Sequence, residues 1–263
     1  MRKFLCYFVL IQLTSLCFAE TLSFFVEGSY CQIAMEDVNE RLEEIRQNSF
    51  DTFINLIKQL GGSGSSSISK FKDGTSFSGG ALYSLNEKMK AAAKISYFSS
   101  NPAQIKGDAS VSIFNQVAEY HGKFNSFVDF TSVMLGYEYI VPQLKLGLGV
   151  GIYLGYAWAN FEAKYSYETI GPNQQQSGGW KLPACGENFI GEGNLIINYN
   201  YSSTLNFFVK LGYRYAIIPE MKAKEDVSEI NVKKGDTVKD ENDETIKFDM
   251  SGMFFSVGMS FKL

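Results

Sequence analysis

The chain has 263 residues, a formal net charge of −4 at pH 7 and a hydrophobic content of 45%, which is ordinary for one large domain or two small ones. Its weak acidity disfavours a nucleic-acid partner, because such a protein needs a basic face. Aromatic residues are abundant, with 22 Phe and 15 Tyr.

The first twenty residues have the three parts of a secretory signal peptide. Arg2 and Lys3 form the positive start, an apolar run ends at Leu16, and the segment 17–19 (CFA) is a small-x-small cleavage site. A membrane anchor would need about 20 apolar residues, and only about thirteen precede Thr14. We therefore predict a cleaved signal at 1–19 and a single domain at 20–263.

Eight later segments alternate between apolar and small or polar residues, a period of two that predicts β-strands. They lie at 22–30, 76–85, 89–98, 132–141, 144–158, 187–199, 204–217 and 250–263. Short connections at 86–88, 142–143 and 200–203 alternate with long ones at 33–74, 100–125, 167–186 and 218–246. An even strand number, tight turns at one end and long loops at the other predict an all-β, up-and-down antiparallel transmembrane barrel.

The composition of the two strand faces indicates which one meets lipid. One face carries long apolar and aromatic side chains, and the other is rich in Gly, Ser and Ala. Only small residues fit a bore of eight strands, whereas a soluble barrel would carry many more charges outside. We therefore expect the apolar face to contact lipid.

The first long connection, at about 35–62, contains a predicted amphipathic helix. Apolar residues recur there every three or four positions: Val38, Leu42, Ile45, Phe53, Ile57 and Leu60. The helix would be on the order of 35 Å long, too long for the bore. It could cover the mouth, lie on the membrane surface or pack against neighbouring loops.

In this pattern over 20–263, without any residue-specific motif, the chain resembles the small eight-stranded outer-membrane barrels of Gram-negative-type bacteria (the OmpA-transmembrane, OmpX and opacity-like group). The resemblance implies a bacterial outer-membrane location, with outer-membrane lipid and the barrel-assembly machinery as partners. Members usually end in an aromatic residue preceded by alternating apolar ones, which serve as the assembly signal. The corresponding residues here are Phe255, Val257, Met259, Phe261 and a final Leu263 in place of the aromatic.

Charged residues also occupy the small, polar face that we expect to line the bore. They are Glu27, Lys90, Lys94, Glu138, Lys145, Glu192, Lys210 and Arg214. Because unpaired charges are costly there, we predict ion pairs and bridging water that fill the bore. The alternative is a narrow conducting path.

Other features of the sequence allow further predictions. Cys31 and Cys185 both fall at the loop end, so they could form a disulfide or remain free thiols. The acidic segment Lys239–Lys247 lacks the glycine and spacing of an EF-hand, so we predict a solvated loop. We predict no metal and no cofactor.

For function, the sequence favours a structural or surface-interaction role, in adhesion or envelope integrity, through loops that bind an extracellular protein or surface ligand. A narrow pore or transporter for small solutes is the alternative. A lipid-modifying enzyme would have to use the single histidine, His121, with Glu119 and Ser126. We do not expect an enzyme.

Overall fold

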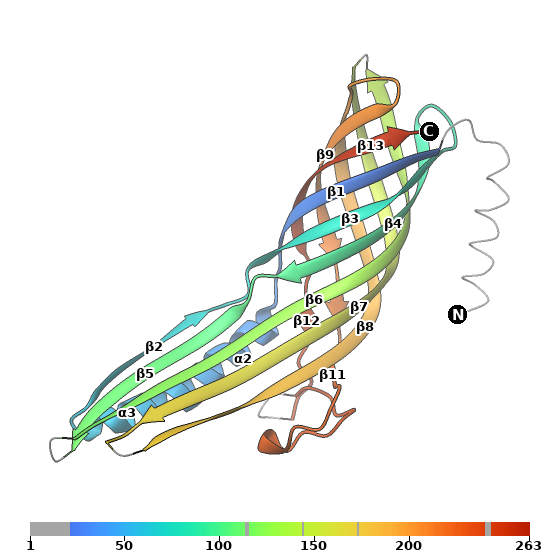
Figure 1. Ribbon diagram of the computed structural model, residues 1–263. Helices are drawn as coiled ribbons and strands as arrows, with labels where there is room; N and C mark the ends of the chain where they lie inside the picture. The colour runs from blue at the N-terminus through green and yellow to red at the C-terminus, as the bar shows by residue number, and fades with distance from the viewer. Residues whose placement is uncertain (1–21, 114–115, 144, 173, 240–242) are drawn as a thin grey trace.

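The computed structural model describes residues 22–113, 116–143, 145–172, 174–239 and 243–263, so the predicted signal peptide and residues 240–242 of the acidic segment lie outside the described residues. Eight antiparallel strands close into a ring, each paired with the next and the last with the first (Figure 1). In ring order they are β1 (Leu22–Gln32), β3 (Asp73–Ser84), β4 (Met89–Ser100), β6 (Gln116–Gln143), β7 (Leu146–Ile170), β8 (Gln175–Asn200), β9 (Leu205–Tyr215) and β13 (Gly252–Lys262). The predicted eight-stranded barrel is confirmed.

Three strands of the ring are much longer than the others. Five strands have 11 or 12 residues, close to what crosses a bilayer, but β6, β7 and β8 have 28, 25 and 26. The excess of roughly 15 residues corresponds to about 50 Å of strand. These strands therefore continue far beyond the barrel, as Figure 1 shows.

The extension is widened by two further strands, β5 (Ala103–Ile113), which pairs with β6, and β2 (Ser63–Ser69), which pairs with β5. We call this sheet, made of β2, β5 and the outer parts of β6, β7 and β8, the platform. It corrects the prediction of long loops at 100–125 and 167–186, because both segments are mainly strand. Their apolar residues on one face, such as Phe124 and Leu182, are buried against other elements.

The outward face of the long strands is apolar within the barrel and polar beyond it. On β7 it reads Leu148, Val150, Ile152, Leu154, Tyr156 and Trp158 within the barrel, and then Asn160, Glu162 and Lys164. On β8 the change lies between Phe189 and Glu187, beside Trp158 in the pairing register. An apolar belt with aromatic residues at its border is the lipid-facing surface of a membrane barrel, so the platform lies in water.

The predicted helix is present and runs along the platform's inner face (Figure 1). It consists of α2 (Glu36–Ile45), a π-helical segment η2 (Arg46–Asp51) and α3 (Thr52–Gln59). A π-turn holds an extra residue, so the buried face passes from Val38 and Leu42 to Phe50 and Ile54. Leu60, predicted on the apolar face, is therefore exposed.

The last long connection covers the platform beside the helix. It contains β10 (Ile217–Ile218), which pairs with β12 (Phe248–Asp249), β11 (Lys222–Ala223), which pairs with β8, and the 3-10 turn η3 (Ser228–Ile230). The platform thus has two layers, a sheet and a cover. No helix within the described ranges combines the length and hydropathy needed to cross a membrane.

Glycines make room for large side chains inside the barrel. A Cβ on Gly136 would lie 2.6 Å from the ring of Tyr153, and one on Gly258 would lie 2.4 Å from the ring of Phe208. Both rings are buried. The small residues of the inner face are therefore required wherever a neighbouring strand places an aromatic ring across the bore.

Candidate functional site

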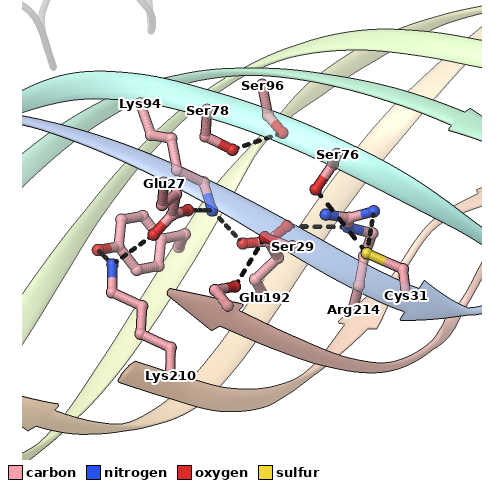
Figure 2. A network of polar contacts seen from close by, with 12 residues as sticks. Glu27, Ser29, Cys31, Ser76, Ser78, Lys94, Ser96, Glu192, Lys210 and Arg214 are labelled. Carbon is pink, nitrogen blue, oxygen red and sulfur yellow. Dashed lines mark hydrogen bonds and ion pairs between the residues drawn. The ribbon is translucent and has the colours of Figure 1, made fainter. Parts of the chain in front are cut away.

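Six buried charges meet in the bore and form one connected set of ion pairs (Figure 2). Lys94 Nζ lies 3.2 Å from Glu27 Oε1 and also contacts Glu192. Lys210 Nζ lies 3.1 Å from Glu27 Oε2 and 3.0 Å from Glu138 Oε1. Arg214 Nε donates to Glu192 Oε1 at 2.8 Å. Three carboxylates thus neutralise three cations on strands β1, β4, β6, β8 and β9.

Aromatic side chains surround these charges. The Tyr153 hydroxyl donates a hydrogen bond to Glu138 and lies 3.4 Å from Lys210 Nζ. Lys210 stands over the ring of Phe208 at 4.7 Å, and the Arg214 guanidinium stands over Phe130 at 5.2 Å. Such contacts stabilise a cation once it has lost water.

Two predicted bore residues lie outside this set. Lys90 is half-buried and sits opposite Glu138 in the pairing of β4 with β6. Lys145 is exposed in the turn before β7, because that strand begins one residue later, at Leu146. Lys145 was predicted to line the bore, but it lies outside the strand that would have placed it there.

The two described cysteines are free thiols, so the candidate disulfide is absent. Cys31 is buried in the bore, where Arg214 Nη1 lies 3.7 Å from its sulfur and the Ser76 hydroxyl lies 3.8 Å away (Figure 2). Cys185 is exposed on β8, next to β11. The thiols are kept apart because β1 and β8 are not neighbours in the ring.

Four of the predicted assembly residues lie on the outer face of β13, the strand that closes the ring against β1, and the fifth, Leu263, directly follows that strand. All are at least one-third exposed: Phe255, Val257, Met259, Phe261 and Leu263. They form part of the lipid-facing belt.

A cavity of about 1280 Å³ lies between the platform and its cover. Its floor is the inner face of β6, β7 and β8, and its walls come from the helix and the last long connection. Aromatic side chains dominate the lining: Phe50, Phe53, Tyr120, Phe124, Phe161, Tyr165, Tyr167, Trp180 and Phe248. Several of these rings contact one another in tilted or edge-to-face arrangements, such as Phe53 and Tyr120 at 4.5 Å between ring centroids.

A polar cluster holds the helix to the edge of the platform at the π-helical segment. Arg46 contacts Glu43, lies 2.7 Å from Asp51 Oδ2 and donates to Ser66 of β2 at 3.3 Å. Hydrogen bonds from the Arg46 guanidinium lower the pKa of the Glu43 carboxyl to about 2. The cluster fixes the helix above β2.

His121 lies on the outward, exposed face of the platform. Its Nδ1 is 2.7 Å from Asp108 Oδ1 and its Nε2 is 3.6 Å from Glu119 Oε2. The hydrogen bond with Asp108 raises the pKa of His121 above its ordinary value. Ser126 lies on the opposite, buried face, so the three residues that an enzyme would need are not brought together.

Sequence reasoning missed the cavity because its residues were assigned to loops. The available signal was an alternation of buried aromatics with polar residues in 118–128 and 161–168. That alternation predicts a strand once its apolar partner, the helix, is taken into account.

Comparison with solved structures returns bacterial surface and outer-membrane proteins. Ail, the attachment invasion locus protein of Yersinia pestis, is 10% identical with a TM-score of 0.38, over 93% of this chain and 99% of that chain. Neisserial surface protein A is 10% identical with a TM-score of 0.36, over 93% and 100%. The outer membrane protease OmpT from Escherichia coli is 8% identical with a TM-score of 0.39, over 93% and 97%.

No protein-family model matches the chain, and no curated protein matches it. The barrel architecture that the predicted resemblance implied is present in the chain itself, as its closed ring of eight antiparallel strands. The closed ring and the apolar belt are this chain's own evidence for the outer membrane.

Proposed function

We propose that this protein is a non-conducting outer-membrane barrel that carries a binding platform on the cell surface. The observation that supports this proposal is the contrast between the barrel and the platform. Buried ion pairs lie in the bore, whereas the platform continues into water and lines a large cavity that carries many aromatic side chains.

The strand ends support the orientation. Short turns at 85–88 and 201–204, and the short connection that includes Lys145, lie at the end of the barrel opposite the platform (Figure 1). In bacterial outer-membrane barrels short turns face the periplasm and long connections face outward. The platform therefore projects from the cell.

Cys185 provides a direct test of this orientation, because it is exposed near the base of the platform while Cys31 is buried. Intact cells expressing the protein would be treated with a membrane-impermeant maleimide. We expect labelling of the wild type and of Cys31→Ser, and none of Cys185→Ser. Labelling that requires disruption of the outer membrane would contradict the proposal.

The closed bore predicts electrical silence. The refolded chain, verified by a heat-modifiable gel shift, would be inserted into a planar bilayer. We expect no single-channel openings, since eight strands leave little space beyond side chains. Stable, reproducible openings would favour the pore alternative instead, with Lys94, Lys210 and Arg214 as candidate selectivity residues.

The proposed role is not enzymatic. The separation of His121 from Ser126 on opposite faces of one sheet supports this view, because a general base must lie within hydrogen-bonding reach of its nucleophile. For His121, Glu119 and Ser126 to act together, their side chains would have to lie on the same face of β6.

A further inference from the structure

The cavity above the barrel contains one polar group that the protein leaves unused. Ser126 lines the cavity floor and is 1% exposed, and its hydroxyl has no hydrogen-bond partner among the described residues. A buried hydroxyl without a partner is unfavourable. An occupant that forms the missing hydrogen bond would remove this cost.

Small residues open space around that hydroxyl. Ser126 lies between Ala103 of β5 and Ala163 of β7 in the strand register, and both alanines are buried. Larger apolar residues stand on either side, including Phe124 and Leu182. On the cavity floor the Ser126 hydroxyl thus has small residues on the neighbouring strands and aromatic residues nearby.

The charged side chains of the lining are satisfied within the protein. Arg41 pairs with Glu44 at 2.9 Å, Lys239 pairs with Asp243 at 2.8 Å, and Asp236 accepts a hydrogen bond from the backbone of Lys233. Because Arg41 and Lys239 already have partners within the protein, the described lining has no unpaired cation for an anionic ligand. The lining favours a neutral molecule.

The volume indicates a large ligand. At about 1280 Å³ the cavity exceeds the roughly 300–1,000 Å³ of sites for drug-sized molecules. A lining of mainly apolar and aromatic side chains with a smaller number of polar ones is the usual composition of a ligand pocket. A long apolar chain satisfies both requirements.

We propose that the cavity binds a long-chain acyl compound whose one neutral polar group, an ester, amide or hydroxyl, hydrogen-bonds to Ser126. This inference rests on the proposed surface role, since the ligand would be taken up outside the bilayer. A free acyl compound and the acyl chain of a membrane lipid share this chemistry, and the test separates them.

Tryptophan fluorescence gives a local readout, because the chain has two tryptophans in different places. Trp180 lines the cavity and Trp158 lies on the lipid-facing belt. Trp158→Phe therefore leaves a cavity reporter, and Trp180→Phe leaves a belt reporter. Both would be refolded into nanodiscs and titrated with the methyl ester of 9,10-dibromostearic acid, whose bromines quench tryptophan on contact.

We expect saturable quenching of Trp180 at one ester per chain, and only gradual, non-saturating quenching of Trp158. Absence of Trp180 quenching, or identical non-saturating curves for both reporters, would overturn the proposal. Nanodiscs of brominated phospholipid, with no ester added, form the second arm. Quenching of Trp180 there would identify membrane lipid as the source of the acyl chain.

Ser126→Ala tests the hydrogen bond, and its fold is not at risk because it removes an unsatisfied hydroxyl. In the Trp180 reporter we expect affinity for the ester to fall roughly two- to tenfold. Dibromo-octadecane, which has no polar group, should bind both forms equally. An equal loss for both probes would show that Ser126 acts only on packing and would overturn its assigned role.

Ala163→Phe adds a large side chain to the cavity lining beside Ser126 and provides a second variant. It should abolish saturable quenching while the heat-modifiable shift persists. If Cys185 labelling fails on intact cells but ester binding persists, the surface role is wrong and the cavity assignment stands. The opposite pattern leaves the surface role and removes the ligand.

Discussion

At the scale of single residues, Glu192 is the carboxylate that joins two cations of the bore, Lys94 and Arg214. Glu192→Gln would leave Lys94 with one of its two carboxylate partners and would remove the carboxylate that pairs with Arg214. Removal of one partner from a buried ion pair costs about 3–5 kcal/mol. We expect the free energy of unfolding, measured in urea with the protein in lipid vesicles, to fall by about that amount.

A matched control for this change exists on the platform. Glu162 pairs with Lys181 at 2.6 Å, but its side chain is partly exposed and that of Lys181 is half-exposed. Glu162→Gln should therefore cost less than about 1 kcal/mol. Equal effects of the two substitutions would contradict the view that the bore network is a buried, mutually dependent set.

The titration of His121 can be followed by NMR without resonance assignment, because it is the only histidine of the chain. The Asp108 carboxylate raises its pKa above the ordinary value of about 6.5. Its contribution to stability is thus complete below about pH 6.5 and is lost as the pH rises through the folded-state pKa. Histidine-labelled NMR should show a midpoint above 6.5.

Asp108→Asn removes the main cause of this shift. We expect the histidine midpoint to move down, with Glu119 retaining part of the effect. A wild-type midpoint at or below 6.5 would mean that His121 and Asp108 do not meet in solution, and would question the pairing of β5 with β6 at this point.

At the scale of elements, the helix is held to the platform by the face that its π-helical segment creates. Phe50 is 3% exposed, whereas Leu56 is 53% exposed on the same helix. Phe50→Ala should weaken docking by about 3–5 kcal/mol. Limited trypsin digestion at Arg46 and Lys58 would then be at least tenfold faster, because cleavage follows the opened state.

Leu56→Ala is the control for this prediction, since it truncates an exposed side chain. It should leave the cleavage rate within about twofold, in line with the small effects of surface substitutions. Equal acceleration by both variants would contradict the view that the packing of Phe50 holds the helix to the platform, because alanine does not lower helix propensity.

The elements also show which parts of the fold can be predicted from sequence. Barrel strands such as β7 alternate cleanly because lipid lies on one side and the bore on the other. The platform was missed because its outer face meets water and its inner face meets a helix that is distant in sequence. The phase shift at Phe50 depends on a π-turn, for which the sequence carries no recognisable signal.

The bore residues show the same limit at finer detail. Alternation predicted that Glu27, Lys94 and Lys210 share the bore, because face follows from the period of two. Which carboxylate meets which cation depends on the shear between neighbouring strands, and a single sequence does not specify it. The exposed position of Lys145 likewise follows from where its strand begins.

At the scale of the whole molecule, β6, β7 and β8 run without interruption from the barrel into the platform. The barrel and the platform therefore share three strands, but they differ in whether their sheet has a free edge. The barrel has no edge, because its ring is closed. The platform ends at β2, a serine-rich strand that pairs only with β5 among the described strands. Unpaired edge strands are the first to open.

Hydrogen exchange in nanodiscs, followed by mass spectrometry, should therefore be graded along the molecule. We expect peptides from β2 (Ser63–Ser69) to exchange first and those from β13 to exchange last, since β13 is paired on both sides by β1 and β9. The long strands should be slow in the barrel and faster beyond Trp158. Protection of β2 equal to that of β13 would show that something covers the platform edge, and would direct attention to a partner at that strand.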